Sequence, residues 1–307
     1  MSITNFFPGG NTAGGFYSLY EYLYRDSDRI FIIKGGPGTG KSTFMKNLGY
    51  SALKQGWEIE FHWCASDNES LDGVVIPGLK IAVVDGTTPH TIDPSLPGAR
   101  EEILYFGEFW DQQYLQQQTE TLLKLTQEIG FAYQQTYNYL KLASLLQQQY
   151  DRYYLNCLQP EKLLNIKTYL QNKITYKPSH NRPAPGRHLF ASALTPEGEV
   201  SFLSELTDQI QQRYLIQGPA QTGSRLLQEL GQQVQEIGQQ VLFLHHPLNP
   251  EQLEAIIIKE LRSALINFHR TDLLHQIKEE DQLIDLLETG GYSPGETYSQ
   301  EIDRDRS

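Results

Sequence analysis

The sequence predicts an α/β protein made of two related domains, and three observations support this prediction. A Gly-rich loop at residues 35–43 lies between an apolar run at residues 30–33 and a helical pattern of apolar residues. A second apolar run, at residues 79–85, ends in an aspartate. The second half of the chain repeats residues of the first half at a nearly constant spacing. A strand, a loop, a helix and a further strand are therefore expected twice.

The loop matches the pattern G-x-x-x-x-G-K-[ST], which binds phosphate groups when it joins a strand to a helix. Its residues are Gly35, Gly36, Pro37, Gly38, Thr39, Gly40, Lys41, Ser42 and Thr43. Glycines let the backbone N–H groups face a phosphate, and the positive end of the helix dipole favours negative charge. We expect Lys41 to contact the β- and γ-phosphates and the Ser42 hydroxyl to ligate Mg²⁺. The alternative is a Gly-rich turn that carries a lysine by chance.

Asp85 is expected to complete the metal site. A strand close to a phosphate-binding loop carries a carboxylate at its C-terminal end, and this carboxylate holds Mg²⁺ through a bound water. The alternative is an aspartate that simply caps the strand. ATP is the default nucleotide, because the first half of the chain has no N/T-K-x-D motif for reading guanine.

A catalytic base is missing from its usual place. Many hydrolytic proteins with this loop have a glutamate directly after the strand-ending aspartate, whereas this chain has Gly86. The remaining candidates are Asp67, Glu69 and Asp72, which follow a strand expected at residues 58–64. One of them could position water or accept a proton from a substrate hydroxyl. The alternative is that they cap a helical turn in a polar surface loop.

Three segments carry a resemblance to known proteins: KGGPGTGKST at residues 34–43, CASDNESLDGVVIPGLKIAVVDGTTPH at residues 64–90 and HLFASALTPEG at residues 188–198. The chain resembles the P-loop NTPases, most strongly over residues 30–56. More widely, it is similar to a group of bacterial ATP-binding proteins with two P-loop domains in tandem. The resemblance implies nucleotide binding and duplicated P-loop NTPase-type three-layer domains, and it implies no particular substrate.

The internal repeat covers most of both halves. Eight residues recur at an offset of 183, as from Thr12 to Thr195, and these are Thr12, Gly15, Ser18, Leu23, Ile33, Gly35, Thr39 and Gly40. Ten more recur at an offset of 182, as from Ser42 to Ser224, and these are Ser42, Leu48, Gly49, Gly56, Phe61, Glu69, Leu71, Ile76, Leu79 and Ala82. Such self-similarity indicates a duplicated domain.

The second copy has lost the groups that a nucleotide needs. The deletion that separates the two offsets removes the counterpart of Lys41, and Asp85 aligns with Asn267. We therefore expect no nucleotide at the second loop, residues 218–224. The apolar spacing of the copy is retained, and eight residues are expected to form its core: Ile216, Leu230, Phe243, Ile256, Ile257, Ile258, Leu261 and Leu265.

Residues 100–174 form an expected helical insertion rich in Gln, Leu and Tyr. The expected helices are residues 100–128, 131–157 and 160–174. Six residues share one helical face and indicate a packing seam: Tyr139, Leu142, Leu146, Tyr150, Tyr153 and Cys157. The insertion could act as a lid or as an arm that binds a protein partner.

The expected division of the chain follows these features. It has a first domain at residues 1–178, a linker at 179–186, a second domain at 187–289 and a disordered polar tail at 290–307. Further helices are expected at residues 16–24 and 271–288. Arg182 or Arg187 could reach a γ-phosphate as an arginine finger. If the second copy packs against the first domain, Arg213 or Arg225 could also lie near the phosphates.

Composition limits the class of protein. The chain has 307 residues, of which 39% are hydrophobic, and no run of apolar residues is long enough to cross a membrane. Its net charge of −12 argues against a broad grip on nucleic acid. Two cysteines, Cys64 and Cys157, and the lack of a signal-peptide pattern lead us to expect a cytoplasmic protein.

The predicted function is Mg-ATP binding with slow hydrolysis that changes contacts between domains or with a partner. A second possibility is a kinase that moves the γ-phosphate to a small molecule or nucleotide, with Asp67, Glu69 or Asp72 as the base. A third is a binding module that is gated by nucleotide without being an enzyme. Phosphate release without an added acceptor would separate the first from the second.

Overall fold

The computed structural model describes residues 2–88, 91–155, 158–174, 182–268 and 277–286. The chain forms two compact units. Unit 1 comprises Met1–Leu140 and Leu189–Phe202, and unit 2 comprises Lys141–His188 and Leu203–Ser307. Each unit therefore takes residues from both halves of the chain.

This division differs from the expected domains at residues 1–178 and 187–289. Residues 189–202 pack with unit 1, and the helical insertion is divided at residue 140, so that residues 141–174 belong to unit 2. The expected linker at 179–186 lies partly outside the described residues, and the expected tail at 290–307 lies wholly outside them.

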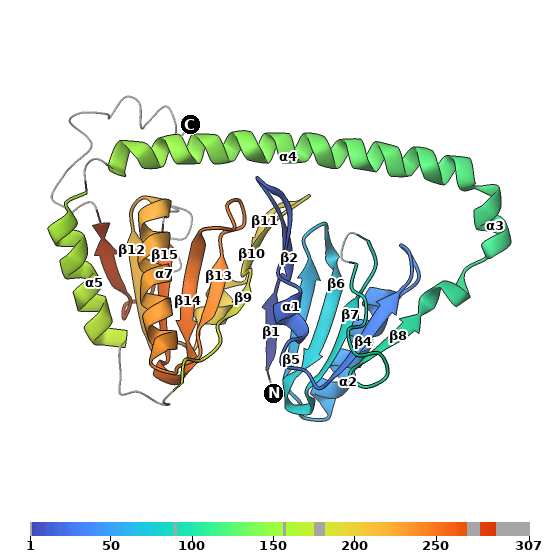
Figure 1. The fold of residues 1–307 in the computed structure, drawn as a ribbon, viewed down its shortest axis with the longest axis horizontal. Helices are drawn as coiled ribbons and strands as arrows, with labels where there is room; N and C mark the ends of the chain where they lie inside the picture. The colour runs from blue at the N-terminus through green and yellow to red at the C-terminus, as the bar shows by residue number, and fades with distance from the viewer. Residues whose placement is uncertain (1, 89–90, 156–157, 175–181, 269–276, 287–307) are drawn as a thin grey trace. The chain divides into compact units, whose positions relative to one another are not determined.

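Unit 1 contains a mixed six-stranded sheet (Figure 1). Its strands, in spatial order, are β1 (Ile3–Phe6), β5 (Ile59–Cys64), β6 (Asp67–Ile76), β7 (Ile81–Asp85), β4 (Arg29–Lys34) and β8 (Glu101–Tyr105). Only β6 is antiparallel to its neighbours, because a hairpin turn joins it to β5. The strands expected at 58–64 and 79–85 are confirmed as β5 and β7. The expected polar loop with a helical turn after residue 64 is wrong, because β6 begins at Asp67.

Helices cover both faces of this sheet. Helix α2 (Lys41–Lys54) packs on one face, where Met45 contacts the cluster that includes Ile33 of β4. The short helix α1 (Glu21–Tyr24) packs on the other, where Leu23 joins Ile32. Neighbouring isoleucines of β4 thus face opposite layers, as the alternation of a strand requires. The helix expected at residues 16–24 is wrong at its start, because β3 (Gly15–Ser18) occupies that stretch.

Unit 2 contains a second six-stranded sheet with the same spatial order of corresponding strands (Figure 1). The order is β9 (Arg187–Leu189), β13 (Leu242–His245), β14 (Leu253–Ile258), β15 (Ser263–Phe268), β12 (Gln212–Gln217) and β16 (Gln282–Asp285). Strand β14 is antiparallel to both neighbours, as β6 is in unit 1, and β12 is parallel to both, as β4 is. The helix expected at 271–288 is wrong at residues 277–285, which are turn and strand, while residues 271–276 and 287–288 lie outside the described part.

The correspondence extends to single residues. Among the described residues, only Lys80 and Arg262 are non-glycine residues with a positive φ, at 55° and 47°. Each follows a short 3₁₀ turn, η1 (Pro77–Leu79) in unit 1 and η3 (Lys259–Leu261) in unit 2. The two residues are separated by the same offset of 182 that the sequence repeat shows.

The core of unit 2 lies between its sheet and helices α5 (Pro160–Ile174) and α7 (Ala220–Glu236). The core expected for the second copy is confirmed. Ile216, Leu230, Phe243, Ile256, Ile257, Ile258 and Leu265 are buried, and Leu261 packs partly buried against them. A short helix, α6 (Leu203–Thr207), also belongs to this unit, and its buried residues are Leu203 and Thr207.

Two β-hairpins complete unit 1. They are β2 (Gly9–Thr12) with β3, and β10 (Ser192–Thr195) with β11 (Gly198–Ser201). Phe7 and Phe190 exchange backbone hydrogen bonds and are both buried in one cluster. This contact explains why residues 189–202 belong to unit 1.

The insertion after β8 consists of the 3₁₀ turn η2 (Phe106–Phe109) and helices α3 (Gln112–Gln117), α4 (Thr119–Leu155) and α5 (Figure 1). The first expected helix starts too early, because residues 101–105 pair with β4 as β8. The expected break near residue 130 is absent, because α4 is one continuous helix of 37 residues.

The expected packing seam on α4 is wrong in part. Tyr139, Leu142 and Leu146 are 72%, 58% and 58% exposed, whereas Ser144 and Asp151 are buried. Contacts with other elements, and not the apolar periodicity, decide which face of α4 is covered. In the described part of the chain, no helix has the length and apolar character needed to cross a membrane.

A close contact between a helix glycine and a strand phenylalanine occurs once within each unit, and it can be tested. An added Cβ would lie 2.5 Å from Phe61 at Gly49 of α2, and 2.4 Å from Phe243 at Gly231 of α7. Gly49→Ala and Gly231→Ala should each lower the free energy of unfolding by about 1–3 kcal/mol through overpacking, measured by urea denaturation. Gly130→Ala is the control, because no atom other than those of its chain neighbours and the nearby helix backbone lies within 4 Å of its added Cβ. It should stabilise α4 by up to about 1 kcal/mol, and equal effects at all three positions would contradict this packing.

Candidate functional site

The Gly-rich loop joins β4 to α2, as the sequence predicts. Strand β4 ends at Lys34 and α2 begins at Lys41, with Gly40 at the N-cap. Gly38 and Gly40 have φ values of 78° and 83°, which residues with a side chain rarely adopt. The loop backbone therefore needs glycine at these two positions, and its N–H groups can form an anion-binding concavity.

Close contacts explain two further glycines. An added Cβ at Gly35 would lie 3.0 Å from Phe106, and one at Gly36 would lie 2.6 Å from the Trp110 ring. Both aromatic residues follow β8, which pairs with β4 on the side away from β7. Sequence reasoning missed Trp110, because nothing in its neighbourhood shows that β8 returns the chain to the loop.

Lys41 and Asp85 approach each other across the carboxyl ends of two parallel strands. Strand β7 is paired with β4 so that Asp85 lies opposite Ile33, and Gly86 donates a backbone hydrogen bond to the Ile33 carbonyl. The Lys41 ammonium is 3.5 Å from one carboxylate oxygen of Asp85. It also donates to the carbonyls of Gly35, at 2.6 Å, and Gly36, at 2.9 Å.

The other oxygen of Asp85 is held by its own turn. The backbone N–H and the hydroxyl of Thr87 both donate to it, at 2.9 and 2.5 Å. The side chain of Asp85 is 14% exposed and that of Lys41 is 10% exposed. A carboxylate fixed in this way has one oxygen directed to Lys41, and both groups lie on the wall of the same cavity.

Ser42 is positioned by the hairpin strand β6. Its hydroxyl oxygen accepts a hydrogen bond from the backbone N–H of Leu71 at 3.0 Å. A hydroxyl oxygen has two lone pairs, so a second one remains for a ligand. Across the described ranges, no group of three or more His, Cys, Asp or Glu side chains is arranged to hold a metal ion. A cation between Ser42 and Asp85 would therefore need most of its oxygen ligands from outside the protein.

A cavity of about 900 Å³ brings these groups together. Residues 35–43 line it, together with Lys34, Cys64, Ser66, Asp67, Ser70, Leu71, Asp72, Asp85, Gly86, Thr87, Thr88, Thr91, Trp110 and Tyr133. This volume is within the range of pockets that bind a small-molecule ligand. Tyr133 comes from α4, so the helical insertion contributes a wall. None of the lining residues in the described part of the chain is an arginine.

The structure separates the three candidate bases. Asp72 is 4% exposed and lines the cavity. Asp67 lines the cavity but is exposed, and its carboxylate accepts from the Glu69 backbone and the Ser70 hydroxyl. Glu69 is exposed and does not line the cavity, and its carbonyl accepts from Lys46. Of the three candidates, only Asp72 is both buried and part of the cavity lining, so it is the best candidate for a general acid or base.

Burial raises the pKa of Asp72 to about 7. Hydrogen bonds from Tyr20 and Cys64 oppose this rise, because they favour the ionised carboxylate, while the charges of Asp85 and Asp67 add to it. Burial also raises the pKa of the Cys64 thiol to about 12, so this thiol stays protonated at neutral pH. A carboxyl group that titrates near neutrality inside a cavity is a candidate for proton transfer.

The second loop is built differently. Helix α7 starts at Ala220, so residues that would form the loop are its first turn instead. Asn267, in the position of Asp85, donates to the carbonyls of Ala220 and Leu253 at 2.8 and 3.3 Å. An added Cβ at Gly223 would lie 2.0 Å from the side-chain amide oxygen of Asn267, so this site is closely filled. The Ser42 contact is nevertheless repeated, since Ser224 accepts from the Leu253 N–H.

The four arginines expected to approach the phosphates have the following surroundings. Arg213 is buried and pairs with Asp281 at 3.1 Å. Arg225 pairs with Glu229 of the same helix, also at 3.1 Å. Arg187 lies in β9, and Arg182 is exposed.

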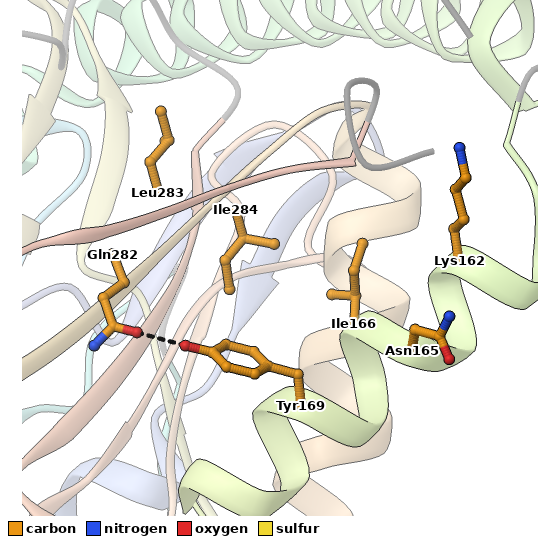
Figure 2. Close-up of a pocket in the computed structure, with 7 residues that line it drawn as sticks. All are labelled: Lys162, Asn165, Ile166, Tyr169, Gln282, Leu283 and Ile284. Atoms are coloured by element: carbon orange, nitrogen blue, oxygen red, sulfur yellow. Dashed lines mark hydrogen bonds between the residues drawn. The ribbon is translucent and has the colours of Figure 1, made fainter. Parts of the chain in front are cut away.

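A second hollow lies in unit 2, between α5 and the edge strand β16 (Figure 2). Ile166 and Tyr169 of α5 point toward β16, and the Tyr169 hydroxyl donates to the Gln282 side chain at 2.8 Å. Its remaining lining residues are Lys162, Asn165, Leu283 and Ile284. It has no carboxylate and no phosphate loop in its lining, so the cavity of unit 1 is the stronger candidate for chemistry.

The raised pKa of Asp72 predicts a pH-dependent stability. The pKa of the folded state, about 7, exceeds the ordinary value of 3.8, so the stability contributed by Asp72 is present below pH 3.8 and lost as the pH rises through 7. In the Asp72→Asn variant the side chain at position 72 does not titrate. The free energy of unfolding of the variant, relative to that of the parent protein, should rise from about pH 4 to about pH 7 and then level off. Thermal unfolding over this pH series measures it. Asp26→Asn, at an exposed position, is the control, and a difference that does not change with pH would show that Asp72 has an ordinary pKa.

Comparison with known proteins adds no assignment: no model of a protein family, no curated protein and no solved structure matches this chain.

Proposed function

We propose that the cavity of unit 1 binds Mg²⁺ and a nucleoside triphosphate, with ATP as the default nucleotide. The observation that carries this proposal is the convergence of Lys41, Ser42 and Asp85 on one cavity beside a loop with left-handed glycines. The ammonium of Lys41 and the hydroxyl of Ser42 come from the end of the loop and the start of α2, and the carboxylate of Asp85 comes from the end of β7. This donor set suits a triphosphate with its magnesium ion.

Each residue has a distinct role in this proposal. The backbone N–H groups of residues 36–42, apart from Pro37, cradle the phosphates, and Lys41 neutralises their charge. The Ser42 hydroxyl, with its remaining lone pair, and the Asp85 carboxylate would be the groups that hold hydrated Mg²⁺. Thr87 fixes the carboxylate of Asp85 through two hydrogen bonds. The metal supplies charge neutralisation of the phosphates.

The reaction that we propose is slow hydrolysis of the γ-phosphate. Gly86 leaves no glutamate after Asp85, and Asp72 is the buried carboxyl group in the cavity that can take a proton from water. With a pKa of about 7, only part of Asp72 is ionised at neutral pH.

Phosphoryl transfer to a hydroxyl-bearing small molecule or nucleotide is the second candidate. The observation that favours it is that Asp72, Ser66, Ser70 and Tyr133 line the cavity beyond the loop, so an acceptor has polar partners there. Phosphate release without an acceptor measures hydrolysis, and turnover that requires an added acceptor indicates a kinase. Binding without either reaction leaves a nucleotide-gated binding module.

We also infer that the two units are duplicated P-loop-type domains, of which only the first binds nucleotide. The shared strand order, the matching left-handed Lys80 and Arg262, and the repeated serine contact support this inference. Tyr133 lines the cavity from α4, so nucleotide binding would act directly on the helical insertion. A protein partner at this insertion is part of the same proposal.

Removing Lys41 should weaken nucleotide binding. In Lys41→Ala the loss of a charge-assisted contact should lower ATP affinity by about tenfold to a hundredfold, because such contacts contribute roughly 1.5–3 kcal/mol. Isothermal titration calorimetry with Mg-ATP measures this, and the parent chain should bind one nucleotide. Lys54→Ala, at the exposed end of the same helix, is the matched control. Unchanged affinity in Lys41→Ala, or two nucleotides per chain, would overturn the assignment.

Removing the charge of Asp85 should affect binding mainly when magnesium is present. Asp85→Asn keeps the shape of the side chain but loses the charge that orients water on the metal. The variant should lose at least about tenfold more affinity for ATP with Mg²⁺ than with EDTA. Equal losses in the two titrations would show that Asp85 only supports the turn at Thr87.

A further inference from the structure

We propose that Asp151 of α4 is the built-in anion of the second loop, where its carboxylate takes the place that a phosphate takes in the proposed site of unit 1. The role of the second loop has thereby changed from binding a ligand to anchoring α4. The proposal rests on the proposed function only for the identity of the anion that is replaced. The contacts themselves lie entirely within unit 2.

Both carboxylate oxygens of Asp151 are used at the start of α7. One accepts from the backbone N–H of Ala220 and the other from that of Gln221, each at 3.2 Å. Gln147, one turn earlier on α4, donates to the first oxygen at 3.3 Å. Asp151 is only 1% exposed, so its charge is balanced by these donors and by the positive end of the α7 dipole.

The sequence repeat places this contact at the phosphate loop. At the offset of 183, Ala220 and Gln221 correspond to Pro37 and Gly38 of the first loop. Because proline has no N–H, only the N–H of Gln221 has a counterpart in the first loop, and that of Ala220 is an additional donor in the second. The one-residue deletion removes the left-handed turn, and these residues wind into the first turn of α7. Exposed N–H groups at a helix start need acceptors, and the N-cap here is Pro219, which has no side-chain acceptor. A carboxylate from another helix therefore supplies the cap.

Asn267 fits the same change. In unit 1 the carboxylate of Asp85 faces the ammonium of Lys41 at 3.5 Å. In unit 2 the lysine is deleted, and a carboxylate at position 267 would face the carbonyl of Ala220, an unfavourable contact between two acceptors. The amide of Asn267 instead donates to that carbonyl at 2.8 Å. The loss of Lys and Asp and the gain of Asp151 thus form one consistent rearrangement.

Burial raises the pKa of Asp151, and the hydrogen bonds from Gln221, Gln147 and Ala220 oppose this because they favour the ionised form. Because Asp151 belongs to α4, its hydrogen bonds to the start of α7 attach α4 to α7. The same helix carries Tyr133, which lines the cavity of unit 1.

Hydrogen exchange of the full chain tests this proposal without any nucleotide. In Asp151→Ala, the amides of Ala220 and Gln221 should exchange about tenfold to a hundredfold faster than in the parent protein, because they lose a charged acceptor. Inorganic phosphate should slow them again in the variant and leave the parent protein unchanged. Arg152→Ala, at the exposed neighbouring position, is the matched control and should not change these amides.

The outcomes separate clearly. Unchanged exchange of Ala220 and Gln221 in Asp151→Ala, or acceleration without any effect of phosphate, would overturn the proposal. If Asp151→Ala does not fold, Asp151→Asn keeps the shape and one acceptor and should show a smaller acceleration of the same amides. Equal acceleration of amides throughout α7 in that variant would also overturn it. Because the readout is at α7, the result does not depend on whether unit 1 binds nucleotide.

Discussion

The parallel pairing of β4 with β7 is the constraint on which the candidate site depends. The register that sets Ile33 opposite Asp85 brings the end of one strand next to the start of the loop that follows the other. Lys41 and Asp85 then lie 3.5 Å apart although 44 residues separate them in the sequence. A one-residue slip of this pairing would turn Asp85 to the other face of the sheet, so the buried isoleucines that hold the register also hold the site.

The antiparallel strand β6 adds the second part of the site. Because a hairpin joins it to β5, its first half runs beside the start of α2, where Leu71 donates to Ser42. The next residue, Asp72, is buried at the cavity wall. The same hairpin therefore positions the serine hydroxyl and the carboxyl group with the raised pKa.

The comparison of the two units shows how an anion site and a structural contact can share one framework. Both sheets keep the same strand order, and both keep the serine that accepts from β6 or β14. In unit 1 the charges of Lys41 and Asp85 balance each other beside a cavity. In unit 2 the amide of Asn267 and the carboxylate of Asp151 from α4 satisfy backbone groups at the start of α7 within the fold.

The sequence by itself determined the strand, loop and helix around Lys41, the strand ending at Asp85 and the apolar core of the second copy. These features follow from local chain geometry and from burial patterns. Only the tertiary structure decided that residues 67–76 form a strand, that Asp72 and not Glu69 faces the cavity, and that Asp151 caps α7. Each of these depends on pairing between segments far apart in the chain, and no local propensity records which backbone groups a distant helix or strand will satisfy.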